Sequence, residues 1–125
     1  MKRIQLILLL LAGFTTASLA QVKKKAVETV IIQTPSVQCE MCKNRVERSM
    51  AREEGQIKTI VDYKRKTTKV TYYTDRTNIE NIKAAIANIG YDADDVTANP
   101  ESYKKLPNCC KKPADGGGMP KDNKQ

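Results

Sequence analysis

Histidine and tryptophan are absent from this chain of 125 residues, and phenylalanine occurs only once. Without histidine, imidazole-based zinc or copper(II) sites and a Ser-His-Asp catalytic triad cannot be built. No phosphate-binding glycine loop and no glycosidase-like pair of carboxylates is evident either. We therefore do not expect an enzyme, and the chemistry that the chain offers is that of its four cysteines.

Aromatic residues suited to stacking on bases are few, and no recognised nucleic-acid motif is present. The chain is nevertheless basic, with 22 Lys and Arg against 14 Asp and Glu and a net charge of +8. A modest positive charge is typical of a well-solvated surface, and it is also compatible with an acidic protein partner. We expect no binding to nucleic acid.

A hydrophobic run long enough to span a membrane is also missing, because the only candidate, residues 4–14, is too short. This run follows Lys2 and Arg3 and precedes small residues at Ser18 and Ala20, which indicates a secretory signal peptide over residues 1–20. An uncleaved anchor is the less favoured alternative. Cleavage leaves 20 basic against 14 acidic residues, a net charge of +6. We expect a periplasmic or secreted protein that does not span a membrane after cleavage.

The rest of the sequence predicts six elements in the order strand, helix, strand, strand, helix, strand. Alternating and helical spacings of apolar residues place them at residues 27–34, 42–53, 57–63, 69–73, 77–89 and 95–98. Thr77 and Glu80 form a predicted capping box for the second helix, and Gly90 is its predicted stop. The expected core consists of Val30, Ile32, Val46, Val70, Ile82 and Ile86, with Lys83 on the opposite face and the cysteine loop outside it. Residues 99–125 are polar and Lys-rich, and we expect a largely disordered tail.

Two cysteines, Cys39 and Cys42, form a C-x-x-C motif between the first strand and the first helix. The Pro35-Ser36 pair ends the strand, because proline restricts its own backbone and that of the preceding residue. The positive end of the following helix favours the thiolate forms. This position suits the capture of a soft metal ion.

The order of elements and this motif resemble the heavy-metal-associated domain family, whose members include copper chaperones, modules of metal-pumping ATPases and the periplasmic mercuric-ion binding protein. Residues 37–42 correspond to the family's M-x-C-x-x-C, Gly55 and Ile57 to a turn, and residues 90–93 to its glycine-tyrosine turn. The resemblance covers residues 27–98. It implies an α+β fold, a ferredoxin-like βαββαβ plait with a four-stranded antiparallel sheet and two helices on one face.

The same resemblance implies that Cys39 and Cys42 ligate the metal. Val37 replaces the family methionine, which packs under the loop, and Gln38 stands where zinc-selective members often carry aspartate. Two thiolates without an oxygen donor favour copper(I), or mercury(II), over zinc, although Glu40 leaves zinc open. The implied function is a metallochaperone that hands its ion to a metal-transporting membrane protein or another metal-binding domain.

Other interpretations of the same residues remain open. Cys39 and Cys42 are compatible with a structural disulfide, or with a periplasmic thiol-disulfide redox protein, although the residues before the motif do not fit that class. Tyr91 is either a core residue or a shield for the metal loop. The basic residues of the first helix are either a solvated face or a docking face for an acidic partner: Lys43, Arg45, Arg48 and Arg52.

Adjacent cysteines at Cys109 and Cys110 are not explained by the resemblance. A disulfide between neighbours is strained, so a bond to Cys39 or Cys42, or an inert exposed pair, are the simple alternatives. Our hypothesis is that the tail folds back, with Leu106 and Pro107 near the metal loop. One or both thiolates would then be accessory ligands in a site of three or four sulfurs, with Lys111 and Lys112 favouring ionisation.

Overall fold

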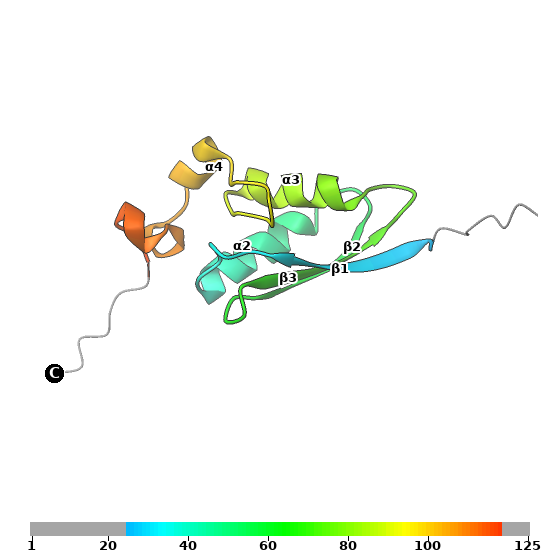
Figure 1. The fold of residues 1–125 in the computed structure, drawn as a ribbon, viewed down its shortest axis with the longest axis horizontal. Coiled ribbons are helices and arrows are strands. Elements are labelled where there is room, and N and C mark those ends of the chain that lie inside the picture. The colour runs from blue at the N-terminus through cyan, green and yellow to red at the C-terminus, as the bar shows by residue number, and fades with distance from the viewer. Residues whose placement is uncertain (1–24, 119–125) are drawn as a thin grey trace, which may run out of the picture.

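The computed structural model describes residues 25–118, so the predicted signal peptide, residues 1–20, and the end of the tail, residues 119–125, lie outside the described residues. Figure 1 shows the arrangement of the described elements. They are β1 (Val27–Gln33), α2 (Glu40–Met50), β2 (Gln56–Asp62), β3 (Thr67–Tyr73), α3 (Ile79–Ile89), α4 (Pro100–Lys104) and the short 3-10 helices η1 (Asn108–Cys110) and η2 (Pro113–Asp115). None of the helices described is long and apolar enough to cross a membrane.

The strands form an antiparallel sheet in the order β1-β3-β2. Val70 in the central strand lies opposite Val30 on one side and Thr59 on the other. The predicted alternation is confirmed for β3, where Val70 and Tyr72 are buried, and in β1 for Ile32, whereas Val30 is only half-buried. Helices α2 and α3 pack against each other and supply buried side chains to the same core.

The predicted fourth strand is not formed in the described part of the chain. Residues 95–98 contain only an isolated bridge, between Ala93 and Val96. Asp94 lies between the bridged residues with a φ of 50°, a left-handed conformation that reverses the chain. The backbone N–H of Asp94 donates to the Gln33 carbonyl, and the Gln33 N–H donates to Asp94 Oδ1. The chain therefore meets the end of β1 at one residue and then turns away from it.

The helices begin and end close to their predicted positions, with one change of cap. Asn78, not Thr77, is the N-cap of α3, and its side chain accepts a hydrogen bond from the Asn81 N–H. Gly90 ends the helix at a φ of 114°, as predicted. Helix α2 begins two residues earlier than predicted, at Glu40, with Cys39 at its N-cap. Both cysteines of the motif therefore belong to the first turn of α2.

Lys83 corrects a second expectation, because it does not lie on an exposed face of α3. Its side chain is only 9% exposed and its ammonium group contacts Asp95 Oδ1 at 2.8 Å and Glu80 Oε1 at 3.0 Å. The hydrogen bonds to Asp95 and Glu80 raise the pKa of Lys83 above its usual value. A long aliphatic stem that ends in a charged head explains how lysine occupies such a position.

The tail is also more ordered than the sequence predicted. The segment from 99 to 118, which we call the strap, contains α4, η1 and η2. Asn99 caps α4 by accepting from the Glu101 and Ser102 N–H groups, and Pro100 occupies its first turn, where a missing N–H costs nothing. Leu106 is 5% exposed and belongs to the core cluster. The strap therefore folds against the domain, beside the N-terminal end of α2 (Figure 1).

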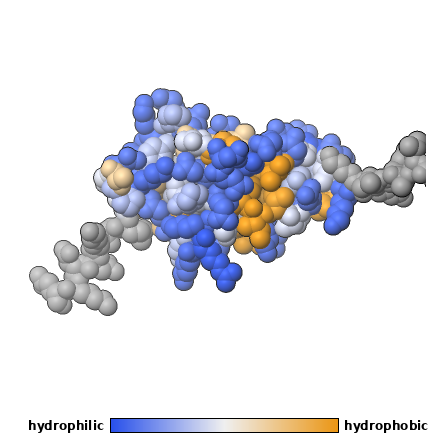
Figure 2. Space-filling model, in the orientation of Figure 1, coloured by the Kyte–Doolittle hydropathy of each residue, from blue (hydrophilic) through white to orange (hydrophobic). Residues whose placement is uncertain are grey.

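The surface is largely hydrophilic, as Figure 2 shows, with an apolar area in the middle of the visible face. Ile31 and Ile60 lie on the outer face of the sheet and are 62% and 43% exposed.

Candidate metal centre

The loop before α2 is part of the core, which corrects the expectation that it lies outside. Val37 is fully buried, and its backbone N–H donates to the Thr34 carbonyl at 3.1 Å. The Lys66 ammonium group donates to the Val37 carbonyl at 2.8 Å. Beneath the loop, the hydroxyl groups of Thr34 and Thr68 are hydrogen-bonded at 2.9 Å. These contacts hold the backbone that carries Cys39.

Three sulfur atoms meet at the N-terminal end of α2. Cys39 Sγ lies 3.3 Å from Cys42 Sγ, and Cys110 Sγ lies 2.7 Å from Cys42 Sγ. All three sulfur atoms lie within 4.8 Å of one another, and every cysteine is a free thiol. Zinc bound to sulfur at about 2.3 Å needs ligand atoms roughly 3.8 Å apart in a tetrahedron. To surround one ion, Cys39 and Cys42 would therefore have to separate by about 0.5 Å, and Cys42 and Cys110 by about 1.1 Å.

The tail reaches the sulfur cluster, but the neighbouring residues Cys109 and Cys110 lie in different surroundings. Cys110 is fully buried in the sulfur cluster, whereas Cys109 is half-buried and its Sγ contacts Met41 Sδ at 3.6 Å. Met41 is 52% exposed. Of the two predicted accessory ligands, only Cys110 is in the cluster; Cys109 lies at the surface beside it.

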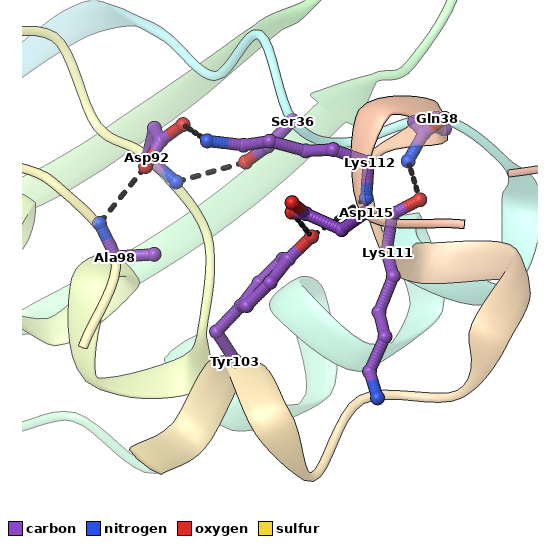
Figure 3. A network of polar contacts seen from close by, with 8 residues as sticks. All are labelled: Ser36, Gln38, Asp92, Ala98, Tyr103, Lys111, Lys112 and Asp115. Carbon is purple, nitrogen blue, oxygen red and sulfur yellow. Dashed lines mark hydrogen bonds and ion pairs between the residues drawn. The ribbon is translucent and has the colours of Figure 1, made fainter. Parts of the chain in front are cut away.

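Polar contacts of the two residues that follow Cys110 hold the strap in place, and Figure 3 shows their arrangement. Gln38, directly before Cys39, donates through Nε2 to the Lys111 carbonyl at 2.7 Å. The Lys112 ammonium group contacts Asp92 Oδ2 at 2.8 Å. The side chain of Gln38 thus joins the two segments that carry cluster cysteines.

Tyr103 fixes the following turn of the strap. Its hydroxyl accepts a hydrogen bond from the Lys112 N–H at 2.8 Å and donates to Asp115 Oδ2 at 2.6 Å (Figure 3). Because Lys112 pairs with Asp92, its charge is not directed at the sulfur atoms as we had expected.

The thiols of the motif differ in their tendency to ionise. Burial opposes ionisation of Cys42, but hydrogen bonds from the Cys110 thiol and the backbone at Gln38 outweigh it and lower the pKa of Cys42. Burial, together with the neighbouring Cys42, raises the pKa of Cys39. Cys42 is therefore the more readily ionised thiol of the pair.

Tyr91 lies on the inner side of the cluster. It is fully buried, and its hydroxyl has no hydrogen-bond partner with suitable geometry among the described residues. Burial, and then the neighbouring sulfur atoms of Cys110 and Cys42, raise the pKa of Tyr91. The interpretation of Tyr91 as a core residue is therefore confirmed, and a role in shielding the cysteine loop stays a prediction.

A basic groove of about 520 Å³ runs from the site along the exposed side of α2. Arg45, Arg48 and Arg52 line it, and Glu40 and Met41 form its end beside the cysteines. Lys43 is half-buried and does not line this groove.

Part of the chain matches a known protein family. Residues 31–92 match the model of the heavy-metal-associated domain. The chain carries a heavy-metal-associated domain. A copper-exporting P-type ATPase of Staphylococcus epidermidis is 32% identical over 74 residues, which are 59% of this chain and 9% of the ATPase. The chain thus spans about a tenth of the length of that relative.

Solved structures share the fold of this heavy-metal-associated domain. Oxidized MerP from Ralstonia metallidurans CH34 superposes with a TM-score of 0.52 and 26% identity, over 54% of this chain and 94% of MerP. The CopZ metallochaperone gives 0.51 and 24%, over 53% of this chain and 98% of CopZ. Cys110 lies beyond residue 92, where the family match ends.

Two residues that hold the strap against the heavy-metal-associated domain, Gln38 and Asp92, were not predicted from the sequence to do so. Gln38 was considered only as a neutral replacement for aspartate, and Asp92 only as part of the glycine-tyrosine turn. Neither carries a local signal, because their partners are 73 and 20 residues away. Asn99-Pro100 was a usable signal, since a capping residue before proline is typical of a helix start.

Proposed function

We propose that this protein is an exported carrier of a soft metal ion, which it binds through Cys39 and Cys42 and passes to a partner. The observation that supports this best is the cluster of buried free thiols at the N-terminal end of α2 in a heavy-metal-associated domain. The role proposed is binding and transfer, with no reaction catalysed on an organic substrate.

Copper(I) is the ion that this ligand set suits best, followed by mercury(II). The groups that converge in the described structure are thiols, and the carboxylate of Glu40, between the two cysteines, belongs to an exposed residue. Soft thiolate ligands favour copper(I), although they also bind zinc. The copper-exporting ATPases among the relatives agree with this choice.

Transfer would proceed by thiolate exchange. A thiolate of the partner forms a new sulfur–metal bond, and Cys39 or Cys42 then leaves as a thiolate, so that the ion keeps its oxidation state throughout. A low coordination number leaves room for the incoming sulfur. The same steps in reverse load the protein.

The partner we propose is a metal-transporting membrane protein, or a metal-binding domain of one. The basic groove along α2 starts at Met41 beside the site, so an acidic partner that docks there would bring its ligands close to the ion. We propose that this exchange takes place in the periplasm or outside the cell, because the sequence of residues 1–20 has the pattern of a signal peptide.

Titration of the reduced protein with copper(I), followed by thiolate-to-metal absorption, tests the proposal. We expect one ion to bind per chain, and we expect Cys39→Ser and Cys42→Ser each to lose most of the affinity, because a hydroxyl is a poor ligand for a soft ion. Wild-type affinity in either variant would show that the ligands are assigned wrongly.

A thiol-disulfide redox protein is the second candidate, and the lowered pKa of Cys42 favours it, because the thiolate is the nucleophile in disulfide exchange. The same preparation separates the two functions. Reduction of a disulfide substrate by the protein, together with no binding of copper(I), would support the redox protein and exclude the carrier.

A further inference from the structure

We propose that Cys110 is a third thiolate ligand, so that the strap completes a buried three-sulfur centre for copper(I). This inference deepens the proposed function and rests on it. It concerns a residue outside the segment that matches the family.

The position of the sulfur atom is the first argument. Cys110 Sγ lies closer to Cys42 Sγ, at 2.7 Å, than Cys39 Sγ does, at 3.3 Å. Cys110 is fully buried and Cys39 is 6% exposed. An ion held by Cys39 and Cys42 would therefore lie against the third sulfur atom, with little access for water or another ligand.

Tyr91 supplies an independent second argument. Its buried hydroxyl lacks a partner of suitable geometry in the described part of the chain, yet it lies beside Cys42 and Cys110. An unpaired buried donor destabilises the fold, because it has given up its hydrogen bonds to water without gaining another partner. A thiolate on the ion would accept this hydrogen bond, so the metal-bound form satisfies a group that the metal-free form leaves unpaired.

Contacts on the residues next to Cys110 fix the backbone of the strap, so the approach of Cys110 to Cys42 is part of the packing of the strap. Gln38 binds the next residue, and Asp92 binds the one after it. A Cβ atom at Gly117 would lie 2.5 Å from Lys111 Cβ and 2.7 Å from the Asn108 carbonyl oxygen. The strap is therefore packed closely on itself on both sides of the η1 turn that carries Cys110.

The chemistry needs no oxidant or reductant. Copper(I) first binds Cys39 and Cys42, whose thiols release their protons to solvent as the two sulfur–copper bonds form, and the Cys110 thiol then loses its proton to solvent as the third bond forms. Copper stays in its +1 state. On release, a partner thiolate takes the position of one leaving cysteine thiolate, as in the two-sulfur exchange.

X-ray absorption on the copper(I)-loaded protein, from residue 21 to residue 125, gives the number of sulfur ligands directly. We expect three in the wild-type protein and two in Cys110→Ser. Competition with a copper(I) chelator should show that Cys110→Ser binds at least about tenfold more weakly, the lower end of what even an outer-shell partner contributes. Cys109→Ser is the matched control, and it should keep three sulfur ligands and wild-type affinity.

Each other outcome overturns the inference. Two sulfur ligands in the wild-type protein, or the loss of a sulfur ligand in Cys109→Ser, would exclude Cys110 as the third ligand while leaving copper binding by Cys39 and Cys42 intact. Absence of copper binding by the wild-type protein would overturn the proposed function as well. The wild-type sulfur count and the Cys109→Ser control decide the matter even if Cys110→Ser does not fold.

Discussion

Lys112 Nζ lies 2.8 Å from Asp92 Oδ2, and this ion pair joins the strap to the turn that follows α3. Asp92 also accepts a hydrogen bond from the Ala98 N–H at 2.9 Å, and its own N–H donates to Ser36 Oγ at 2.9 Å. The loop before α2, the turn after α3 and the strap therefore meet at one residue, Asp92 (Figure 3).

The Asp92 pair predicts how acid affects the strap. Partial burial alone would raise the pKa of Asp92, but the hydrogen bonds from Lys112 and the Ala98 N–H lower it below 3.8. A carboxyl group whose pKa is lower in the folded state stabilises the protein above its unfolded pKa, and this contribution is lost as the pH falls through the folded value. We expect the protection factors of the strap amides against hydrogen exchange, which are relative to the intrinsic rate at each pH, to fall below pH 3.8 in the metal-free protein.

Asp92→Asn is the control for that experiment, since it removes the titrating group and keeps the shape. It should exchange faster than wild type near neutral pH, with a cost of at most about 1 kcal/mol because Lys112 is 44% exposed. An unchanged acid response in Asp92→Asn would assign the effect to other carboxylates.

Burial of the cysteine loop changes the expected cost of ligand substitutions. Cys42 is fully buried in the core cluster, so Cys42→Ser places a hydroxyl where a thiol packs. We expect the metal-free protein to fold but to lose about 1–3 kcal/mol of unfolding free energy in urea. The half-buried Cys109 provides the comparison, and Cys109→Ser should change the unfolding free energy by less than about 0.5 kcal/mol.

Helix α3 supplies two of the side chains on which the core depends. Ile82 is 3% exposed and Ile86 is fully buried. Replacement of either residue by alanine should lower the unfolding free energy by about 2–5 kcal/mol. Asn88→Ala, on the exposed side of the same helix, should stay within about 0.5 kcal/mol of wild type. Similar losses at all three positions would contradict the orientation of α3.

Gly117 tests the packing of the strap without touching a sulfur atom. Gly117→Ala would bring a Cβ within 2.6 Å of the Lys111 carbonyl oxygen, so the strap must shift. We expect Gly117→Ala to bind copper(I) more weakly, toward the level of Cys110→Ser. Ala114→Gly, at an exposed position of the strap, is the control and should bind as wild type; equal affinity in Gly117→Ala and wild type would mean that the shift does not reach Cys110.

Local patterns were sufficient to predict the strands β1 to β3, the two long helices and the position of the C-x-x-C motif. The alternation of apolar residues predicted that Val70 and Tyr72 are buried. Gly90 was predicted to end α3 because glycine readily adopts the left-handed conformation in which many helices end. These features depend on residues within a few positions of one another.

The remaining features depend on distant partners. Lys83 was placed on the wrong face because helical spacing does not reveal that Asp95 and Glu80 both reach its ammonium group. The predicted fourth strand does not form, because Asp94 adopts a left-handed conformation and contacts the end of β1. Cys110 and Cys42 are 68 residues apart in the sequence. Their contact was only a hypothesis, because sequence spacing does not distinguish a tail that folds back onto the domain from an inert one.

The turn at Asp94 has a consequence for the solubility of the protein. Because the chain leaves β1 after one residue, the outer edge of this strand has no neighbouring strand among the described residues. An unpaired strand edge is a template for the addition of another chain and for aggregation. Charged residues limit this risk, and Lys25 and Glu28 are exposed at the start of the edge. Concentrated protein would therefore be expected to self-associate more readily if these two charges were removed.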